Sequence, residues 1–592
     1  MLGKRTAQGS LFGSDQIFRS LVGEESFYVY LADHRHELFC DEDFASLYCM
    51  DNGRPSIAPS ILAVALLLQW YDNISDEEAA RRAKLDLAWK VALGLELMDV
   101  PFVKSVLCEF RNKLILHKQQ KRFFELSLRH ARAQGFFKAR NIRVALDTTP
   151  IFGRGAVEDT FNMLAEALRL LIRTLATEAQ QTPEDYAQAH DYSRYIVAKS
   201  FKGSFSSVDW DDADQRQTVL DGLVADCERG LMLAQKALTL KNPESAHREE
   251  IVKASALLAR LLAQDVTRTN AGGPEIIQGV AQERIVSVHD QEMRHGRKSA
   301  SQCFDGYKGA LAVEPESQLI TAVDVLPGNA HDRRDSHKLI TESATTTGST
   351  VDTVIGDGAY GTIEARLEAQ EAATPYTLVA PVAHAPRMGR FTKEDFQFKS
   401  DRSEVCCPAG EVTRTYYERR QTTITGRTFP YRRFVFRSDQ CTVCRLRSQC
   451  VKEKTSFRTV NFHEHEELVS EAKSFQRTDA FHTIYRRRIA VEHRIARLMH
   501  FGARQARYFG SSKVLFQLAM TAALANLTLV AAQRPLGVFI VWLLAVTCIL
   551  LLDSRSRIKY ETLPRVDSSR TMLYPPTLLK TGGCQLAFQC HV

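Results

Sequence analysis

Short apolar segments with the character of buried strands recur along this chain between longer helical patterns. One of them ends at Asp147-Thr148-Thr149-Pro150, and another is stopped by Gly356-Asp357-Gly358. The expected strands are 143–146, 304–313, 319–326, 353–355 and 376–382. A helical pattern at 335–345 separates the third strand from the fourth. This order predicts an α/β fold built on a mixed sheet.

Two stretches interrupt the pattern of the sheet and are expected to be insertions. Residues 160–265 are amphipathic, with leucines at helical spacing, and residues 386–475 are rich in Thr, Arg and Cys and alternate like β-structure. The expected division is a helical domain at 16–140, a first part of the sheet domain at 141–385 with a helical insertion at 158–282, a cysteine-rich β module at 386–475, a second part of the sheet domain at 476–533, and an atypical tail at 534–592.

Composition excludes several classes of protein, and the distribution of charge points to a partner. With 44% hydrophobic and 25% charged residues, the chain fits neither a disordered, a collagen-like nor a polytopic membrane protein. The net charge of +7 is small for 592 residues. Basic side chains nevertheless gather at 411–460 and again at 481–513. Such blocks suit a phosphate backbone, although solvated surface charge explains either block equally well.

Three short helices are expected near the amino terminus. The first covers 61–70, Ser75 caps the second, and the third ends at Gly94. They would form a helix-turn-helix-like unit, with Arg81 and Arg82 available for DNA, or a plain structural bundle.

Four cysteines of the β module have the spacing of a structural zinc site. Cys441-x-x-Cys444 is followed by Cys450, and either Cys407 or Cys406 supplies the fourth thiolate. Reduced thiols without a metal are the alternative. The 13 cysteines and the lack of an apolar amino-terminal signal region favour a reducing compartment, so we expect a cytoplasmic protein.

One apolar run, 538–552, raises the question of a membrane. Its 15 residues are fewer than the roughly 20 that span a bilayer, so a buried terminal helix is expected and a membrane-anchored nuclease is a minor alternative.

Three acidic residues, Asp147, Asp357 and Glu492, are the candidates for chemistry. The first two follow predicted strands, where α/β sheets collect reactive groups. Glu492 lies among arginines on a long helix expected over 479–499, with Arg488 one turn earlier. Arg488 would orient the carboxylate or bind a phosphate, or form an ordinary surface pair. Carboxylates are ligands for Mg²⁺, and a pair of such ions supports phosphodiester displacement.

The motifs around these acids resemble those of the bacterial insertion-sequence DDE transposases. The resemblance is carried in order by Asp147-Thr148-Thr149-Pro150-Ile151, by Arg294-His295-Gly296-Arg297-Lys298 with Phe304-Asp305-Gly306-Tyr307-Lys308, by Ile355-Gly356-Asp357-Gly358-Ala359-Tyr360-Gly361, and by Tyr485, Arg488 and Glu492 at their family spacing. The family continues with a lysine seven residues after the glutamate, where this chain has Met499. Arg494 and Arg497 are its nearest basic substitutes.

The resemblance implies a ribonuclease-H-like mixed sheet, with the helical insertion and a zinc-ribbon-like β module, preceded by an all-α DNA-binding domain. It implies a catalytic triad of Asp147, Asp357 and Glu492 that holds Mg²⁺ or Mn²⁺, with Tyr485 and Arg488 in support. The expected DNA contacts are Arg81, Arg82, Lys298, Lys308, Arg494 and Arg497. The implied function is cleavage and strand transfer at the terminal inverted repeats of an insertion sequence, on double-stranded DNA and as a homo-oligomer. The alternative is an inactive DNA-binding regulator or a decayed copy.

Overall fold

A computed structural model describes most of the chain. The described residues are 1–5, 14–49, 52–197, 201–205, 207–240, 247–270, 272–279, 281, 283–299, 301–382, 389–399, 401–422 and 426–533. The chain divides after Gln533, and the unit that follows, Arg534–Val592, lies outside the described residues together with the apolar run 538–552.

The amino-terminal region is helical, and its turns follow the predicted capping residues. The Ser75 hydroxyl accepts from the backbone N–H of Glu78, Asp86 accepts from two N–H groups of the next helix, and Gly94 ends that helix in the left-handed conformation. The helices are α1 (Ser14–Ile17), α2 (Arg19–Val22), α3 (Phe27–Leu38), α4 (Pro59–Tyr71), α5 (Asp76–Leu85), α6 (Leu87–Leu93), α7 (Lys104–Leu116) and α8 (Arg122–Ala133), with a 3₁₀ turn at Asp41–Leu47.

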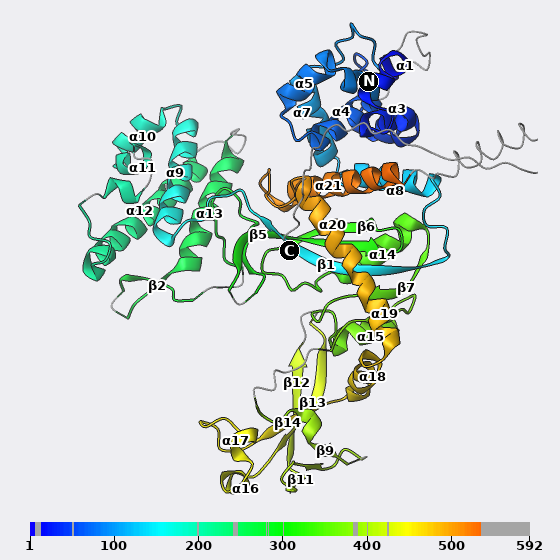
Figure 1. Cartoon of the computed structure of the whole chain (residues 1–592). Coiled ribbons are helices and arrows are strands. Elements are labelled where there is room, and N and C mark those ends of the chain that lie inside the picture. The colour runs from blue at the N-terminus through cyan, green and yellow to red at the C-terminus, as the bar shows by residue number, and fades with distance from the viewer. Residues whose placement is uncertain are drawn as a thin grey trace, which may run out of the picture. The chain divides into compact units, whose positions relative to one another are not determined.

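A mixed sheet of six strands forms the centre of the described unit (Figure 1). Its strands are β1 (Asn141–Phe152), β4 (Arg294–Arg297), β5 (Cys303–Glu314), β6 (Leu319–Pro327), β7 (Thr350–Ile355) and β8 (Thr377–Val379). The order is β4-β5-β1-β7-β8, and β6 also pairs with β5. Strand β5 is antiparallel to β1, β4 and β6, whereas β1, β7 and β8 are mutually parallel.

Strand β1 is longer than the sequence predicted. The prediction ended the strand at Leu146, but β1 continues through Asp147 to Phe152, because β5 goes on pairing with it after β7 has stopped. Phe152, the last residue of β1, also forms backbone hydrogen bonds on the side that faces away from β5. The N–H of Phe152 donates to Arg504 at 2.9 Å, and its carbonyl accepts from the N–H of Ala506 at 2.8 Å.

Helix α21 (Ser511–Ala532) joins the sheet to the amino-terminal helices. It packs on β6, α8 and α4, and the buried Asn526 pins it by accepting from the N–H of Ile320 at 2.9 Å and donating to the Ile320 carbonyl at 2.8 Å. Among the described residues, α21 is the one helix long and apolar enough to cross a membrane. Because 78% of its apolar window is buried in the protein, its composition fits a core helix.

The helical insertion has a hydrophobic core of its own. It leaves the sheet after β1 and comprises α9 (Thr160–Glu178), α10 (Pro183–Ala189), α11 (Ser193–Val197), a 3₁₀ turn (Lys202–Ser204), α12 (Ala213–Leu240) and α13 (Arg248–Asp265). Two short paired strands, β2 (Val266–Arg268) and β3 (Pro274–Ile276), follow the helices before β4 begins. The predicted leucine face of α9 is buried in this core.

The cysteine-bearing stretch forms two small antiparallel sheets. One contains β9 (Gln397–Phe398), β10 (Val405–Cys406) and β11 (Val412–Thr413), and the other contains β12 (Tyr416–Thr422), β13 (Thr428–Val435) and β14 (Thr459–His463). A 3₁₀ turn (Lys393–Asp395) precedes them, and α16 (Ser438–Thr442) and α17 (Arg447–Cys450) lie within the second. Six buried apolar residues form the core: Phe396, Val405, Phe434, Phe436, Val460 and Phe462.

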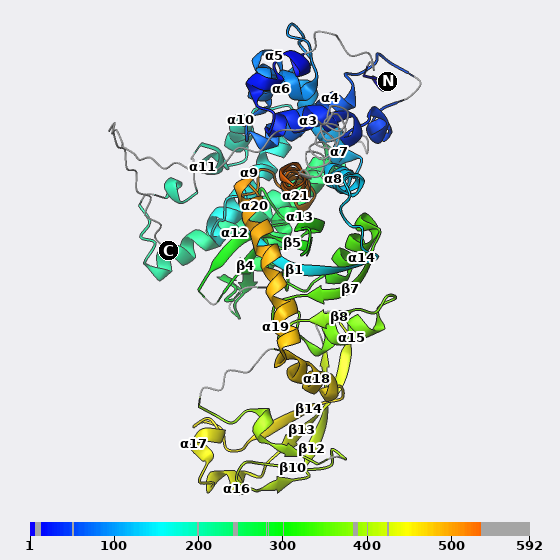
Figure 2. The ribbon, with the colours of Figure 1, turned by 45° about the vertical axis from the view of Figure 1, so that its right-hand side comes forward.

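The remaining helices cover the sheet or lead back to it. They are α14 (Ser336–Thr347), α15 (Ile363–Glu371), α18 (Glu466–Gln476), α19 (Asp479–Tyr485) and α20 (Ile489–His500). Figures 1 and 2 show α20 lying across the sheet, where it contacts β1 and β5. One continuous helix over 479–499 was predicted. Instead, a 3₁₀ turn at Arg486–Arg488 separates α19 from α20.

Candidate functional site

The register between β1 and β7 places Asp147 and Asp357 side by side. The last paired residues of the two parallel strands are Ala145 and Ile355, and each aspartate comes two residues later in its own strand direction. Since side chains alternate along extended backbone, residues two apart project to the same side. The two carboxylates therefore lie together just past the last residues that β1 and β7 pair with each other, at Asp357 beyond the end of β7 and at Asp147 within the part of β1 that pairs only with β5. The Asp357 carboxylate also accepts from the N–H of Ala359 at 2.9 Å.

Arg488 connects this pair to the third predicted acid. Its guanidinium donates to Asp147 Oδ2 at 2.6 Å and to Glu492 Oε1 at 2.7 Å. The side chains of Arg488 and Asp147 are 17% and 16% exposed, whereas that of Glu492 is 56% exposed. Only the Glu492 side of the cluster therefore opens widely to solvent. The structure thus brings together residues 341 positions apart in the sequence.

The environment of Asp147 disfavours its negative charge. Burial is the main cause, and the charges of Asp357 and Asp332 act in the same direction, so the pKa of Asp147 rises to about 6 despite the opposing charge of Arg488. A carboxylate whose pKa is shifted by burial and by specific neighbouring charges is a candidate for a functional site. The buried Nε of Arg488 has no hydrogen-bond partner within the described chain.

Two tyrosines complete the surroundings of the acids. Tyr485 stacks on Phe481, and burial followed by the charges of the acidic cluster raises its pKa. Tyr360 is buried, with its pKa raised by burial and by the charges of Asp147, Asp332 and Asp357, and its hydroxyl donates to the carbonyl of Asp332 at 3.0 Å. Tyr485 was predicted from its spacing, whereas the role of Tyr360 was not.

Asp332 is a fourth acid that the sequence analysis missed. Its carboxylate accepts from the hydroxyl of Thr148 at 2.7 Å and from the ammonium of Lys308 at 2.7 Å. Lys308 is buried and also donates to the carbonyl of Ala330. Asp332 lies in the loop between β6 and α14, where no strand or glycine pattern marks it. The sequence feature that could have pointed to Asp332 is its place shortly after Pro327-Gly328, which mark a turn at the end of a strand.

The other expected DNA contacts are spread over several surfaces. Arg81 and Arg82 lie on α5 and both pair with Glu78, and Lys298 is exposed just after β4. Arg494 and Arg497 lie on α20 and are partly buried, the latter 4.5 Å above the ring of Phe501. Lys308 is the exception, since its ammonium faces Asp332 inside the protein. Within the described chain these six residues thus form no single patch.

The four predicted zinc ligands line one cavity of the β module. Cys407, Cys441, Cys444 and Cys450 border it, whereas the Cys406 thiol points to the carbonyl of Cys407 instead. Burial raises the pKa of Cys450, and the three neighbouring thiols add to the effect. Among the described residues, however, no three of these sulfur atoms lie within 4.8 Å of one another. Four thiolates on one zinc ion stand about 3.8 Å apart.

Two protein-family models match the chain, one near each end of the described unit. The Transposase DDE domain matches residues 406–531, and the Transposase domain (DUF772) matches residues 17–113. The first match includes the cysteines and Glu492, and the second covers most of the amino-terminal helices. Neither a curated protein nor a solved structure matches the chain. The two matches confirm the resemblance seen in the motifs and are consistent with an insertion-sequence DDE transposase.

Proposed function

We propose that this protein is a DDE transposase that cuts DNA at the terminal inverted repeats of its own element and joins the freed 3′ ends to target DNA. The observation that carries the proposal is the shared position of Asp147 and Asp357, each two residues past the last rung of β1 and β7, with Glu492 tied to Asp147 through Arg488. A five-strand path with antiparallel and then parallel pairing supports the ribonuclease-H-like class of sheet.

The donor set suits hard divalent cations. Asp147, Asp357 and Glu492 would hold Mg²⁺ or Mn²⁺, because carboxylate oxygens are the preferred ligands of these ions and the cluster carries repelling charges that a cation would relieve. When bound, such ions supply an activated water or hydroxyl and neutralise charge on the phosphoryl group. The partly buried Asp147 would be the more rigidly placed ligand, and the exposed Glu492 the one nearer to incoming DNA.

Arg488 and Tyr485 have positioning roles in this proposal. Arg488 holds the carboxylates of Asp147 and Glu492 at hydrogen-bond distance from one guanidinium, so it fixes the rotation of α20 relative to β1. Tyr485 is stacked on Phe481 within the electrostatic influence of Arg488 and would help to position that side chain.

DNA would be held mainly by the basic module and the amino-terminal helices. Every residue of β12 is exposed, and this strand carries Tyr416, Tyr417, Arg419 and Arg420, with the acidic Glu418 between the tyrosines and the arginines. Aromatic and basic side chains on one exposed strand suit a nucleic-acid backbone. Arg81, Arg82, Lys298, Arg494 and Arg497 are the further proposed contacts. A transposase joins two element ends, so a homo-oligomer in the cytoplasm is part of the proposal.

The cysteine module would bind Zn²⁺ through Cys407, Cys441, Cys444 and Cys450. The module has a core of only six buried apolar residues, so a metal would contribute much of its stability. All four cysteines line one cavity, and binding would require the sulfur atoms to move closer to one another.

The proposed activity is tested by cleavage of DNA that carries the ends of the element, with Mg²⁺, Mn²⁺ or Ca²⁺. Asp147→Asn, Asp357→Asn and Glu492→Gln should each lower the cleavage rate by about 10³-fold or more while leaving DNA affinity unchanged. Asp352→Asn is the matched control, because Asp352 is an exposed aspartate of the same strand β7. Specific binding by the intact protein without nicking under any of these ions would instead favour the inactive regulator.

A further inference from the structure

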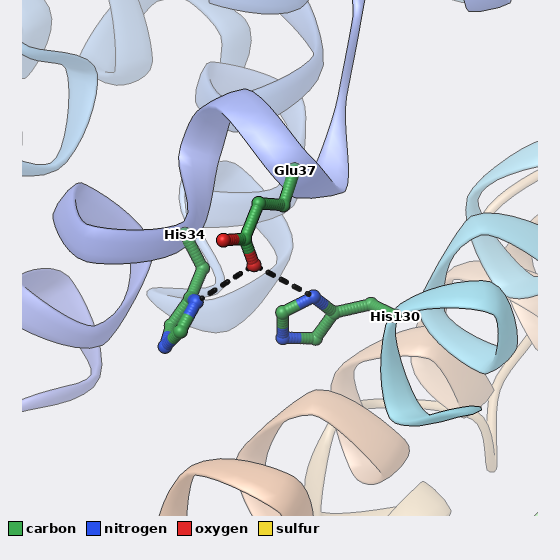
Figure 3. Close-up of side chains that lie close together, drawn as sticks. All are labelled: His34, Glu37 and His130. Atoms are coloured by element: carbon green, nitrogen blue, oxygen red, sulfur yellow. Dashed lines mark hydrogen bonds and ion pairs between the residues drawn. The ribbon is translucent and has the colours of Figure 1, made fainter. Parts of the chain in front are cut away.

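Two histidines and a glutamate meet between α3 and α8, far along the fold from the acidic cluster. His34 and Glu37 lie one turn apart on α3, and His130 projects from α8 toward them (Figure 3). Glu37 Oε2 lies 3.1 Å from His34 Nδ1 and 3.9 Å from His130 Nδ1. All three potential ligand atoms lie within 4.8 Å of one another, the one such group of three among the described residues.

The buried His130 has a nitrogen that the protein leaves unsatisfied. His130 is 2% exposed, its Nε2 lies 2.7 Å from the hydroxyl of Tyr30, and its Nδ1 has no hydrogen-bond partner within the described chain. Burial, followed by the charge of His34, lowers the pKa of His130 to about 4, so the ring is neutral at physiological pH. A buried polar atom without a partner costs about 1 to 3 kcal/mol, so its position calls for an explanation.

One of the two tautomers of His130 would make this nitrogen a metal ligand. If Nε2–H donates to the Tyr30 oxygen, the lone pair of Nδ1 faces the Glu37 carboxylate, and two acceptors oppose each other at 3.9 Å. A cation between them turns both into ligands. The hydrogen bond from Nε2 to a hydroxyl is also the outer contact that usually orients a metal-bound histidine.

We propose that His34, Glu37 and His130 bind one transition-metal ion, with Zn²⁺ as the occupant. Two imidazoles and one carboxylate are a borderline-soft donor set that suits Zn²⁺ better than Mg²⁺ or Ca²⁺. Ligand bonds of about 2.0 to 2.1 Å require donor atoms about 3.3 Å apart. Glu37 Oε2 lies 3.1 and 3.9 Å from the two histidine Nδ1 atoms, close to that separation. Three protein ligands leave a fourth position for water.

The ion would brace the amino-terminal helices against the catalytic unit. Helix α3 belongs to the region that matches the DUF772 transposase domain, whereas α8 lies beyond that match and packs on α21. Because α21 is pinned to β6 through Asn526, a metal joining α3 to α8 would link the helical region to the sheet that carries the acids. The site is thus structural in this proposal, and it does not depend on DNA cleavage.

The test is the number of zinc ions retained by the full-length protein after metal removal, reloading and gel filtration, measured by mass spectrometry. His34→Ala and Glu37→Gln should each retain one equivalent fewer than the wild type. They should also lose the part of the zinc-induced rise in Tm that the site supplies. His36→Ala is the matched control, because His36 is an exposed histidine of the same helix outside the cluster. His130 itself is buried, so its replacement would confuse folding with binding.

A second set of variants distinguishes zinc bound at this site from zinc bound at the cysteine cavity. Replacing Cys441 and Cys444 by serine should leave the difference of one equivalent between the wild type and Glu37→Gln intact. Equal zinc content in the wild type, His34→Ala and Glu37→Gln would overturn the proposal. Loss of one equivalent in His36→Ala as well would also overturn it, since the loss would then not depend on the three proposed ligands.

Discussion

The acidic cluster and the cysteine cavity bring together side chains of the same general kind, potential metal ligands, by opposite means. Asp147 and Glu492 are more than 300 residues apart, and buried strands and a packed helix hold their backbones in place. The cysteines lie within the short stretch 407–450, on loops and single-turn helices over a core of six residues. In the first region the core sets the geometry and a metal would be added to it. In the second, a metal would set the geometry.

The largest effect is expected from removing one of the proposed zinc ligands of the cysteine module. Cys444→Ser, or a strong chelator, should reduce the hydrogen-exchange protection of β13 amides by at least about 100-fold, because the module would lose its main source of stability. Protection of β1 should not change. Cys406→Ser is the matched control, since that thiol does not border the cavity. Undiminished protection in Cys444→Ser would show that the six-residue core suffices.

The next largest effect is a loss of folding stability with rising pH, caused by Asp147 in the acidic cluster. The pKa of Asp147 is about 6 in the folded protein and about 3.9 in an unfolded chain, so the folded state binds more protons between these values. The stability of the wild type should therefore fall as the pH rises through this window. Relative to the wild type, Asp147→Asn should gain about 2 to 3 kcal/mol between pH 4 and pH 7 in urea unfolding.

Asp352→Asn should show no such gain, because Asp352 is an exposed residue of β7. A stability difference between Asp147→Asn and the wild type that stays constant with pH would contradict this account of the acidic cluster.

The stability of the core that positions the acids should depend on the buried side-chain amide of Asn526. Asn526→Ala removes both hydrogen bonds between α21 and the backbone of Ile320 and leaves two buried groups without partners, which should cost about 2 to 3 kcal/mol of unfolding free energy. Thermal unfolding of Asn526→Ala beside Thr528→Ala, whose hydroxyl bonds only within its own helix, measures this. Equal stabilities would mean that the two hydrogen bonds do not fix α21.

The smallest expected effect concerns the support of the fourth acid. Thr148→Val keeps the shape of the side chain but removes its hydrogen bond to Asp332, which should slow cleavage by about two- to fivefold and destabilise the fold by about 1 kcal/mol. Thr353→Val, at a position of β7 where the hydroxyl contacts only the adjacent Asp352, is the control. Identical cleavage rates for Thr148→Val and the wild type would show that Asp332 does not depend on this contact.

Local sequence patterns predicted much of this fold, because helix caps, turns and apolar strand segments depend on interactions between residues close in the sequence. Ser75 caps α5 through its own hydroxyl, Gly94 ends α6 in a conformation that favours glycine, and the paired strands β5 and β6 follow the apolar segments expected for them. The three acids were found because two of them follow strand signals and the third lies on an amphipathic helix. Their proximity was an expectation that the register of β1 and β7 now explains.

What the sequence did not predict depends on partners distant in the chain. The length of β1 follows from β5, and the break in the helix at Arg486–Arg488 lies where Arg488 reaches Asp147. Asp332 becomes part of the site only through Thr148 and Lys308. The meeting of His34 with His130 likewise requires α3 and α8 to pack, which no spacing within either helix reveals.

The double attachment of Phe152 has a consequence for changes in the length of the helical insertion. The helical insertion departs directly after a residue that is anchored to β5 on one side and to the segment following α20 on the other. It rejoins the sheet through β4, which is anchored to β5 in turn. Both points of departure are thus fixed from outside the insertion. A change in the length of the insertion is therefore expected to leave the acidic cluster in place.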